Sequence, residues 1–414
     1  MIFTLLDDLL DITLAVALAL ILARFLGYLF DRLKQPPVIG EILAGVFLGG
    51  FGLGLISEQS FSIFNWTIIL PRINYVGQDF SVFAGLGILF LMFISGLEIN
   101  LSKFRGMGKA SFYTAVGGVI LPLILGFVVS IRFGFSWQAS SIIGLTLVAT
   151  SVGVTVRTLM DLKILNTYPG ITILGAAVID DVIGIILLTF LLGIDSMIVI
   201  VFKVFLYFLI FAYLGLKVMG KILNLGERIQ LPKAFLGISI AIMLIYSYFA
   251  YQSGITGIIG AFLAGTLIGN TVYSKKIIED VKTLGYGLFI PLFFVWVGAS
   301  VDLTAFLTIG FFAIVIIVVG VLGKIIGCSI GAKIAGLKTS DSLQVGVGMI
   351  PRMEMALITV SIAITQNIIA EDIAKKILAT VILVTFVTTL IGPPLIKVTI
   401  NLENIFKRFR RKTW

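Results

Sequence analysis

Apolar stretches of about twenty residues recur along the whole chain, separated by short polar connections. A helix of about this length, rising about 1.5 Å per residue, spans the hydrocarbon core of a bilayer. The pattern predicts an all-α polytopic membrane protein with about 13 transmembrane helices in a single transmembrane domain, 1–414. The predicted spans are roughly 10–30, 38–56, 82–98, 109–131, 138–160, 171–193, 198–221, 234–252, 255–269, 284–300, 304–332, 342–367 and 374–398. The longest connection, about 57–81, is interpreted as a polar and aromatic loop.

The composition fits this class: the chain has 414 residues, of which 59% are hydrophobic and only 12% are charged. Its net charge is +9, but the basic residues lie in short connections between spans, so we expect no nucleic-acid partner. Cys328 is the only cysteine and there are no histidines, which excludes an internal disulfide, a cysteine-cluster metal site and imidazole-based pH sensing. Asp7, Asp8 and Asp11 precede the first apolar run, which is therefore expected to be a mature helix rather than a signal peptide.

The thirty Lys and Arg residues predict the orientation of the chain. Most lie in alternate connections and the C-terminal segment, including Arg32, Lys34, Lys103, Arg105, Lys109, Lys275, Lys276, Lys407, Arg408, Arg410, Arg411 and Lys412. The opposite connections hold only Arg72, Arg132, Lys375 and Lys376. By the positive-inside rule, the N-terminus is outside and residues 399–414 form a short basic cytoplasmic tail. Arg24 and Lys203 fall within spans and are interpreted as snorkelling side chains near helix ends.

An internal repeat relates two parts of the chain. Ile39–Gly49 and Ile259–Gly269 share the pattern Ile-Gly-x-x-Leu-Ala-Gly-x-x-x-Gly, and Gly96–Leu101 aligns with Gly298–Leu303. Spans 2 and 3 thus correspond to spans 9 and 10. The equivalents are seven spans apart, an odd number, so they cross the membrane in opposite directions. Inverted repeats are typical of secondary transporters, which bind their substrate at the midplane between the repeats.

The offset of the second match also pairs the polar middles of spans 5 and 12. Gly144–Thr155 aligns with Gly346–Leu357. Pro351 lacks an amide donor and disfavours helical geometry at Ile350, so span 12 is expected to break there. Two interrupted helices at matched positions indicate a transporter binding site. If they cross, their half-helix ends bring partial charges together that fixed charges must balance.

Two adjacent acids, Asp180 and Asp181, lie in the middle of span 6. An intramembrane charge costs at least about 2.5–3.5 kcal/mol on insertion scales, so we favour a functional pair over a purely structural one. Such neighbours titrate as a coupled system. A carboxylate with Thr150, Ser151 and freed backbone carbonyls offers the oxygen ligands that a hard cation prefers. Cation and proton then compete for the same oxygens, which couples their movements.

Other charged residues also lie within spans. Lys324 either pairs with one of the aspartates or snorkels to the cytoplasmic surface, and the residue pattern leaves both open. Arg352 and Glu354 follow the predicted break at Pro351, and for both a structural role in balancing charge is favoured over direct ion coordination. For Glu41, in span 2, an interfacial position is favoured over a role as a cavity-lining acid.

Together these residues resemble the cation:proton antiporter-2 family, the sodium/proton exchangers of the NapA and NhaA type. The resemblance covers nearly the whole chain. It rests on Gln35–Gly45, Leu91–Glu98, Ala149–Thr155, Asp180-Asp181, Gly323-Lys324 and Pro351-Arg-x-Glu354. It implies an NhaA-type fold with inverted repeats and two crossed broken helices. It also implies a core domain, about 109–193 and 304–398, and a dimerisation or panel domain, about 1–100 and 198–300.

The resemblance further implies roles for the site residues. Asp181 matches the principal carboxylate that binds Na⁺ and H⁺, and Asp180 matches the neighbour that pairs with the lysine, here Lys324. Thr150 and Ser151 match the unwound crossing segment. An aspartate pair with this lysine is similar to the electrogenic branch of the family, in which protons exceed sodium ions per cycle.

The expected function is exchange of cytoplasmic Na⁺ or Li⁺ for external H⁺ by a homodimer in a prokaryotic cell membrane, serving pH homeostasis. Na⁺ and H⁺ are the transported substrates, and no cofactor or enzymatic activity is expected. The alternative is potassium/proton exchange of the Kef type. An intramembrane aspartyl protease is disfavoured because its Tyr-Asp and Gly-x-Gly-Asp contexts are missing from the sequence. A passive channel would differ by conducting ions without saturable exchange.

Overall fold

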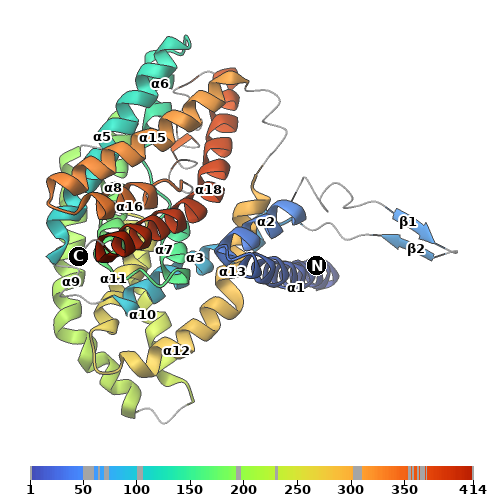
Figure 1. Cartoon of the computed structure of the whole chain (residues 1–414). Coiled ribbons are helices and arrows are strands. Elements are labelled where there is room, and N and C mark those ends of the chain that lie inside the picture. Colours follow the sequence, from blue (N-terminus) through green and yellow to red (C-terminus); the bar gives the residue numbers. More distant parts are fainter. Residues whose placement is uncertain are drawn as a thin grey trace. The chain divides into compact units, whose positions relative to one another are not determined.

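The computed structural model describes residues 2–49, 60–63, 66–69, 74–99, 106–192, 197–228, 232–301, 310–352, 356, 359–360, 363, 369 and 371–412. Helices dominate these ranges, with one β-hairpin among them (Figure 1). The chain divides into two compact units, Met1–Leu91 with Val281–Leu303 and Met92–Asp280 with Thr304–Trp414. The assignment of core and dimerisation domains made from the sequence stays a prediction.

The first unit consists of helices from two separate segments of the chain, Met1–Leu91 and Val281–Leu303. It contains α1 (Ile2–Arg32), α2 (Pro37–Leu48), the start of α3 (Gln78–Glu98), the end of α12 (Ser274–Leu284), the π-helix η2 (Gly285–Phe289) and α13 (Ile290–Ala299). Helix α2 begins at a proline, which suits the first helical position because the amide there has no intrahelical partner. Small residues of α1 pack in its core, including Ala15, Ala19 and Ala23.

The repeat motif marks a close helix contact within this unit. A Cβ atom at Gly45 of α2 would lie 2.0 Å from the carbonyl oxygen of Val295 in α13. A Cβ atom at Gly298 would lie 1.9 Å from the carbonyl oxygen of Ile42. Glycine at both positions lets the two backbones approach, as small residues do at membrane helix interfaces.

Part of the expected 57–81 loop is a hairpin, which corrects the sequence interpretation. Strand β1 (Ser60–Ile63) pairs antiparallel with β2 (Trp66–Ile69), and Ser60 lies opposite Ile69. The physical signal is the alternation of polar and large apolar residues in Ser-Phe-Ser-Ile, followed by the β-branched run Thr-Ile-Ile. The C-terminal end of the same stretch, from Gln78, already belongs to α3.

The second unit contains the remaining helices. They are α5 (Gly108–Arg132), α6 (Trp137–Thr146), α7 (Val152–Asp161), α8 (Tyr168–Leu192), α9 (Met197–Arg228), α10 (Ala234–Gln252), α11 (Gly257–Gly269), α15 (Phe311–Ile334), α16 (Thr339–Gly348) and α18 (Glu371–Lys412). Helix α18 continues through most of the predicted tail.

Nine helices in the described ranges are long and apolar enough to cross a membrane. The apolar helices α2 and α11 are shorter, with 12 and 13 residues. The remaining two of the predicted spans, 138–160 and 342–367, are the ones predicted to be interrupted. Helices α6 and α7 form the two halves of the first, and α16 forms the start of the second. The polytopic helical fold predicted from the hydrophobic pattern is confirmed, with the hairpin of β1 and β2 as an addition.

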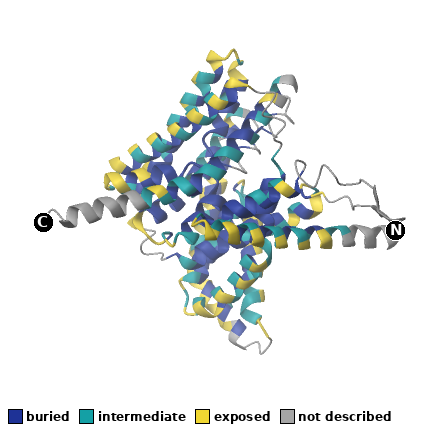
Figure 2. Ribbon diagram, turned by 45° about the vertical axis from the view of Figure 1, so that its right-hand side comes forward, coloured by how far each residue is buried: buried dark blue, intermediate teal, exposed yellow. Residues whose placement is uncertain are grey.

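Buried and exposed residues alternate along the long helices, so that each helix has a buried and an exposed side (Figure 2). Helix α9 exposes large apolar residues along its length, including Ile198, Phe202, Phe205 and Tyr213. In a bilayer such a surface faces lipid, because a helix satisfies its own backbone and has no need of water.

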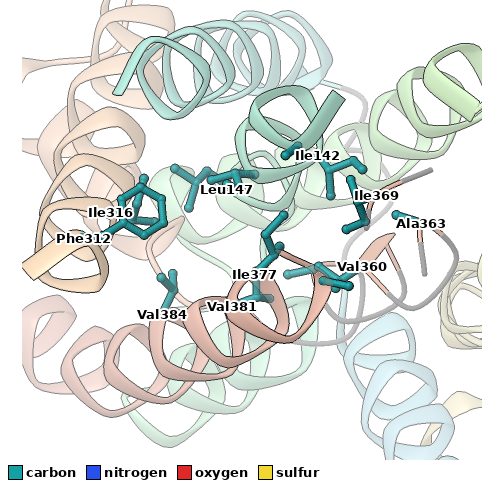
Figure 3. Packing of buried hydrophobic residues seen from close by; sticks show 14 residues of the cluster. Ile142, Leu147, Phe312, Ile316, Val360, Ala363, Ile369, Ile377, Val381 and Val384 are labelled. Atoms are coloured by element: carbon teal, nitrogen blue, oxygen red, sulfur yellow. The ribbon is translucent and has the colours of Figure 1, made fainter. Parts of the chain in front are cut away.

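The core of the second unit lies beside the helix breaks. Ile142 and Leu147, from α6 and its end, pack with Phe312 and Ile316 of α15 and with Val381 of α18 (Figure 3). This cluster joins three helices around the point where α6 stops. It therefore fixes the position of the unwound segment that follows.

Candidate ion-binding site

The first broken span is interrupted between Leu147 and Ser151. Helix α6 ends at Thr146, and α7 begins at Val152. The Ser151 side chain caps α7 by accepting a hydrogen bond from the Val154 amide, with an N–O distance of 3.4 Å. A serine at this position satisfies an amide that the first helical turn leaves unpaired. The interruption thus follows from a local capping signal.

The second broken span stops where the sequence predicts. Helix α16 ends at Gly348, and residues 350–352 are not helical. Pro351 causes this, because it lacks an amide and restricts the residue before it. Helix α18 supports the break: Thr389 Oγ1 donates to the Arg352 carbonyl oxygen at 3.0 Å.

The two interrupted segments contact each other directly. The Ser151 amide donates to the Pro351 carbonyl oxygen at 2.6 Å. Thr155 Oγ1 donates to the Gly348 carbonyl oxygen at 3.1 Å. Backbone groups that lose their helical partners in an apolar interior need others, and here each broken span supplies them for its counterpart.

Arg352 lies at this contact and is fully buried. Its guanidinium donates to the carbonyl oxygen of Leu147 from Nη2 at 3.0 Å and from Nε at 3.2 Å. It also donates to the carbonyl oxygens of Ile350, at 3.1 Å, and Gly320, at 2.7 Å. Leu147 and Ile350 follow the C-terminal ends of α6 and α16, which carry partial negative charge. One planar cation thus balances both ends.

Asp180 of α8 receives two donors on a single oxygen. Lys324 Nζ, from α15, lies 2.5 Å from Asp180 Oδ2, and both side chains are fully buried. Thr150 Oγ1, from the first break, donates to the same oxygen at 2.8 Å. Asp180 Oδ1 has no hydrogen-bond partner among the described residues. A buried charge pair is tolerated only with such compensation, since desolvation of each ion costs several kcal/mol.

Asp181 is the adjacent residue on α8 and is 3% exposed. Successive helical residues point about 100° apart, so the two carboxylates face different surroundings. Thr150 and Ser151 are also buried beside the break. Of these two, Thr150 contacts an acid, whereas the Ser151 hydroxyl caps α7.

Most of the residues singled out from the sequence therefore meet in one unit. Lys324 pairs with Asp180 and does not snorkel, which resolves the alternatives left open above. Arg352 contacts helix ends. Glu354 lies outside the described residues, so its role stays a prediction.

Two charged residues of the first unit make contacts that the sequence did not indicate. Glu41 is buried in α2, with 2% of the residue exposed, and its interfacial position stays a prediction. Arg24 is exposed, its guanidinium donates to the Tyr286 carbonyl oxygen in the π-helix, and its interpretation as a snorkelling side chain also stays a prediction. A π-turn displaces the regular bonding pattern of a helix, and the arginine supplies a donor there.

Sequence reasoning missed several residues around the breaks. Thr389 carries no local signal, because threonine is common in spans and its bond to Arg352 joins distant segments. Arg157, within the predicted span 138–160, lies in α7, is 6% exposed and pairs with Asp161 at 3.1 Å. Their spacing of four residues on a helix was the available clue.

This architecture defines a class of protein. A polytopic helical membrane protein, with two broken spans in contact and a buried Asp–Lys pair beside them, is an ion transporter of the crossed-broken-helix type.

Comparison with known proteins gives the family. The model of the transmembrane sodium/hydrogen exchanger family matches residues 17–398, and the chain belongs to this family. The probable Na⁺/H⁺ antiporter GerT of Bacillus cereus is 33% identical over 359 residues, covering 85% of this chain and 91% of its own. The Na⁺/H⁺-K⁺ antiporter GerN of the same organism is 32% identical over 394 residues, covering 94% and 96%.

A solved structure shows the same fold. The sodium/proton antiporter MjNhaP1 of Methanocaldococcus jannaschii matches with a TM-score of 0.66 and 19% identity, covering 94% of this chain and 96% of its own. The similarity to sodium/proton antiporters predicted from the motifs is thus confirmed by the family and by the fold.

Proposed function

We propose that the protein is a secondary antiporter that exchanges cytoplasmic Na⁺ or Li⁺ for external H⁺. The observation that carries this proposal is the buried acid pair beside two broken helices, with Lys324 bound to one of the acids. Family membership and the names of the relatives support the same exchange. The proposed cycle uses no cofactor and involves no enzymatic reaction.

In this proposal Asp181 is the shared site for Na⁺ and H⁺. A carboxylate binds either a proton or a hard cation, and it cannot hold both at once. Thr150 and backbone carbonyls of the unwound segments supply further oxygen ligands near the acid pair. If only the loaded carboxylate crosses between the two sides, the fluxes of cation and proton are coupled.

Asp180 and Lys324 have a different role. The lysine neutralises Asp180 when no cation is present, and bound Na⁺ competes with that interaction through its positive charge. Release of the lysine proton in that step adds a second proton to the exchange. The transport cycle is then electrogenic.

The proposal is tested by replacing Asp181 with asparagine, which keeps the size of the side chain and removes its charge. In everted membrane vesicles with a preformed pH gradient, the wild-type protein should dissipate the gradient when Na⁺ is added. Asp181→Asn should reduce this response to the level of vesicles without the protein. Asp31→Asn serves as a control, because it removes an exposed carboxylate from the end of α1. Normal exchange by Asp181→Asn would overturn the assignment.

Potassium/proton exchange of the Kef type is not favoured, because the relatives described above are named for Na⁺ and H⁺. The name of GerN also includes K⁺, which makes K⁺ a necessary part of the test. The same vesicle assay with Na⁺, Li⁺ and K⁺ should show dissipation by Na⁺ and Li⁺ at lower concentrations than by K⁺.

The proposal also covers the location, assembly and membrane orientation of the protein. It is a multi-pass membrane protein, and we assign it to the cell membrane of a prokaryote as a homodimer with an external N-terminus and a cytoplasmic C-terminus. The distribution of Lys and Arg supports this orientation.

A further inference from the structure

The Lys324 side chain bridges two helices that both pack against a third. Lys324 lies on α15 and Asp180 on α8, and α5 contacts both of these helices. The ion pair therefore forms at the surface of α5, and whatever α5 presents there limits the position of the amine.

Helices α5 and α15 approach each other through glycine. A Cβ atom at Gly117 would lie 2.2 Å from the carbonyl oxygen of Gly327, and one at Gly331 would lie 2.1 Å from that of Tyr113. These contacts are between backbones, so they leave little room for adjustment. Lys324 starts on α15 between Gly327 and Gly323, and a Cβ atom at Gly323 would lie 3.1 Å from the Cα of Pro122 in α5. Its side chain therefore has few alternative paths.

Gly118 of α5 faces the lysine. A Cβ atom at Gly118 would lie 3.5 Å from Lys324 Nζ and 3.7 Å from its Cδ. The nearest atom would be Cys328 Sγ, at 2.4 Å. Gly118 thus differs from its neighbour Gly117, because it faces side chains of α15 and not its backbone.

We propose that Gly118 is a positioning residue for transport: its missing side chain keeps open the space through which Lys324 reaches Asp180. The inference rests on the proposed function, in which this ion pair takes part in exchange. A Cβ atom at position 118 would itself make ordinary contact with the lysine, and the additional methyl groups of a β-branched side chain would take up the space through which the amine reaches Asp180 Oδ2. The consequence is the same as loss of the lysine charge at the site, even though Lys324 is still present.

The experiment separates this role from general helix packing. All variants carry Cys328→Ala, which removes the atom that a new side chain would meet first. In this background Gly118→Val, Lys324→Ala and the combined variant are reconstituted into vesicles, and Na⁺-driven H⁺ flux is measured across pH and at controlled membrane potentials. Residues in contact show interaction energies of about 0.5–3 kcal/mol, so we expect Gly118→Val to lower the rate about tenfold.

The pattern across variants decides the outcome. Gly118→Val should shift the pH profile and the potential dependence in the same way as Lys324→Ala, and the combined variant should be no slower than Lys324→Ala alone. The inference would be overturned if the rate of the combined variant fell by the product of the two single losses and the pH profile of Gly118→Val stayed that of the parent. Gly118 would then act only through helix packing. Gly184→Ala is the control for a helical glycine, because the added methyl group would meet no described atom within 4 Å apart from its chain neighbours and the backbone of its own helix.

A second measurement does not depend on transport. In purified protein, Gly118→Val should lower the temperature of thermal unfolding less when Lys324 is already alanine than when it is lysine. Equal losses in both backgrounds would contradict contact with the lysine. Absence of Na⁺/H⁺ exchange in the Cys328→Ala parent and the wild-type protein would overturn the proposed function, whereas the thermal result would still test the position of Lys324.

Discussion

At the scale of single residues, Arg352 makes the most demanding set of contacts in the described part of the site. Its guanidinium reaches three carbonyl oxygens that belong to two broken spans and α15. A guanidinium is a rigid planar fork with five donors, whereas a lysine is a single point charge on a flexible chain. Positive charge alone therefore does not replace it.

We predict that Arg352→Lys is destabilising although it conserves charge. Each buried carbonyl left without a donor costs about 1–3 kcal/mol, so the loss should be at least about 2 kcal/mol. Thermal unfolding of detergent-solubilised protein measures the effect. Arg32→Lys is the matched control, because Arg32 is exposed and its Nε donates to Tyr28 Oη, 2.7 Å away. Equal unfolding temperatures for the two variants would contradict the predicted role of the guanidinium.

The sequence identifies the charged members of the site but not their neighbours. Asp180, Asp181 and Lys324 are evident because ionisable residues are rare in apolar spans. Gly118 is one glycine among 44, and nothing in its local sequence distinguishes it. Its significance comes from a contact with residues more than 200 positions away, which only the packing of α5 on α15 creates.

At the scale of elements, glycine spacing predicts where helices touch. Gly45 and Gly265 occupy equivalent positions of the repeat motif. Gly45 faces the backbone of α13, and Gly265 would place a Cβ atom 2.2 Å from the carbonyl oxygen of Phe93. The motif thus encodes two close contacts, one in each compact unit.

We predict that Gly45→Ala destabilises the protein by about 1–3 kcal/mol, because overpacking against a backbone forces the helices apart. The control is Gly85→Ala in α3, where, among the described residues, the added methyl group meets no atom within 4 Å outside its chain neighbours and the backbone of its own helix. It should be neutral or slightly stabilising, since alanine favours helix more than glycine does. Thermal unfolding of the two variants side by side is the test, and an equal loss from both would show that helix propensity or another common cause dominates.

Breaks in helices could also be predicted from sequence, with different precision in the two spans. Pro351 specifies the end of α16 to within a few residues. The break after Thr146 has no proline, and its signal is the Thr150-Ser151 pair before the α7 apolar run. The hairpin of β1 and β2 was missed because a polar and aromatic connection between spans was interpreted only by its composition.

At the scale of the whole molecule, the hydrophobic pattern determines the class of fold, and the repeat predicts which spans of the two halves are equivalent. The length of an apolar run does not reveal where its helix stops. Helix α12 and α13 are joined through a π-helix, and α18 runs well past its apolar segment. Such features depend on local bonding, including the contact of Arg24 with the π-helix, and not on hydrophobicity.

The charge carried through the cycle is also a property of the whole molecule. If one Na⁺ leaves the cell while two H⁺ enter, one net positive charge moves inward per cycle. A potential that is negative inside then drives exchange, with about 2.3 kcal/mol available per charge at 100 mV. Lys324 supplies the second proton in this scheme, because its ion pair with Asp180 is the charged contact that Na⁺ disturbs.

We therefore predict that imposed membrane potential accelerates Na⁺/H⁺ exchange by the wild-type protein in reconstituted vesicles and that Lys324→Ala abolishes this dependence. Without the lysine, Asp181 alone exchanges one proton for one cation, and no net charge crosses. Lys333→Ala is the control, because that lysine lies on the same helix and donates to Thr339 Oγ1 at 2.9 Å, at an exposed position. Exchange by the wild-type protein at a rate unaffected by potential would exclude electrogenic coupling while leaving the antiport itself intact. Retained potential dependence in Lys324→Ala would place the second proton on another group.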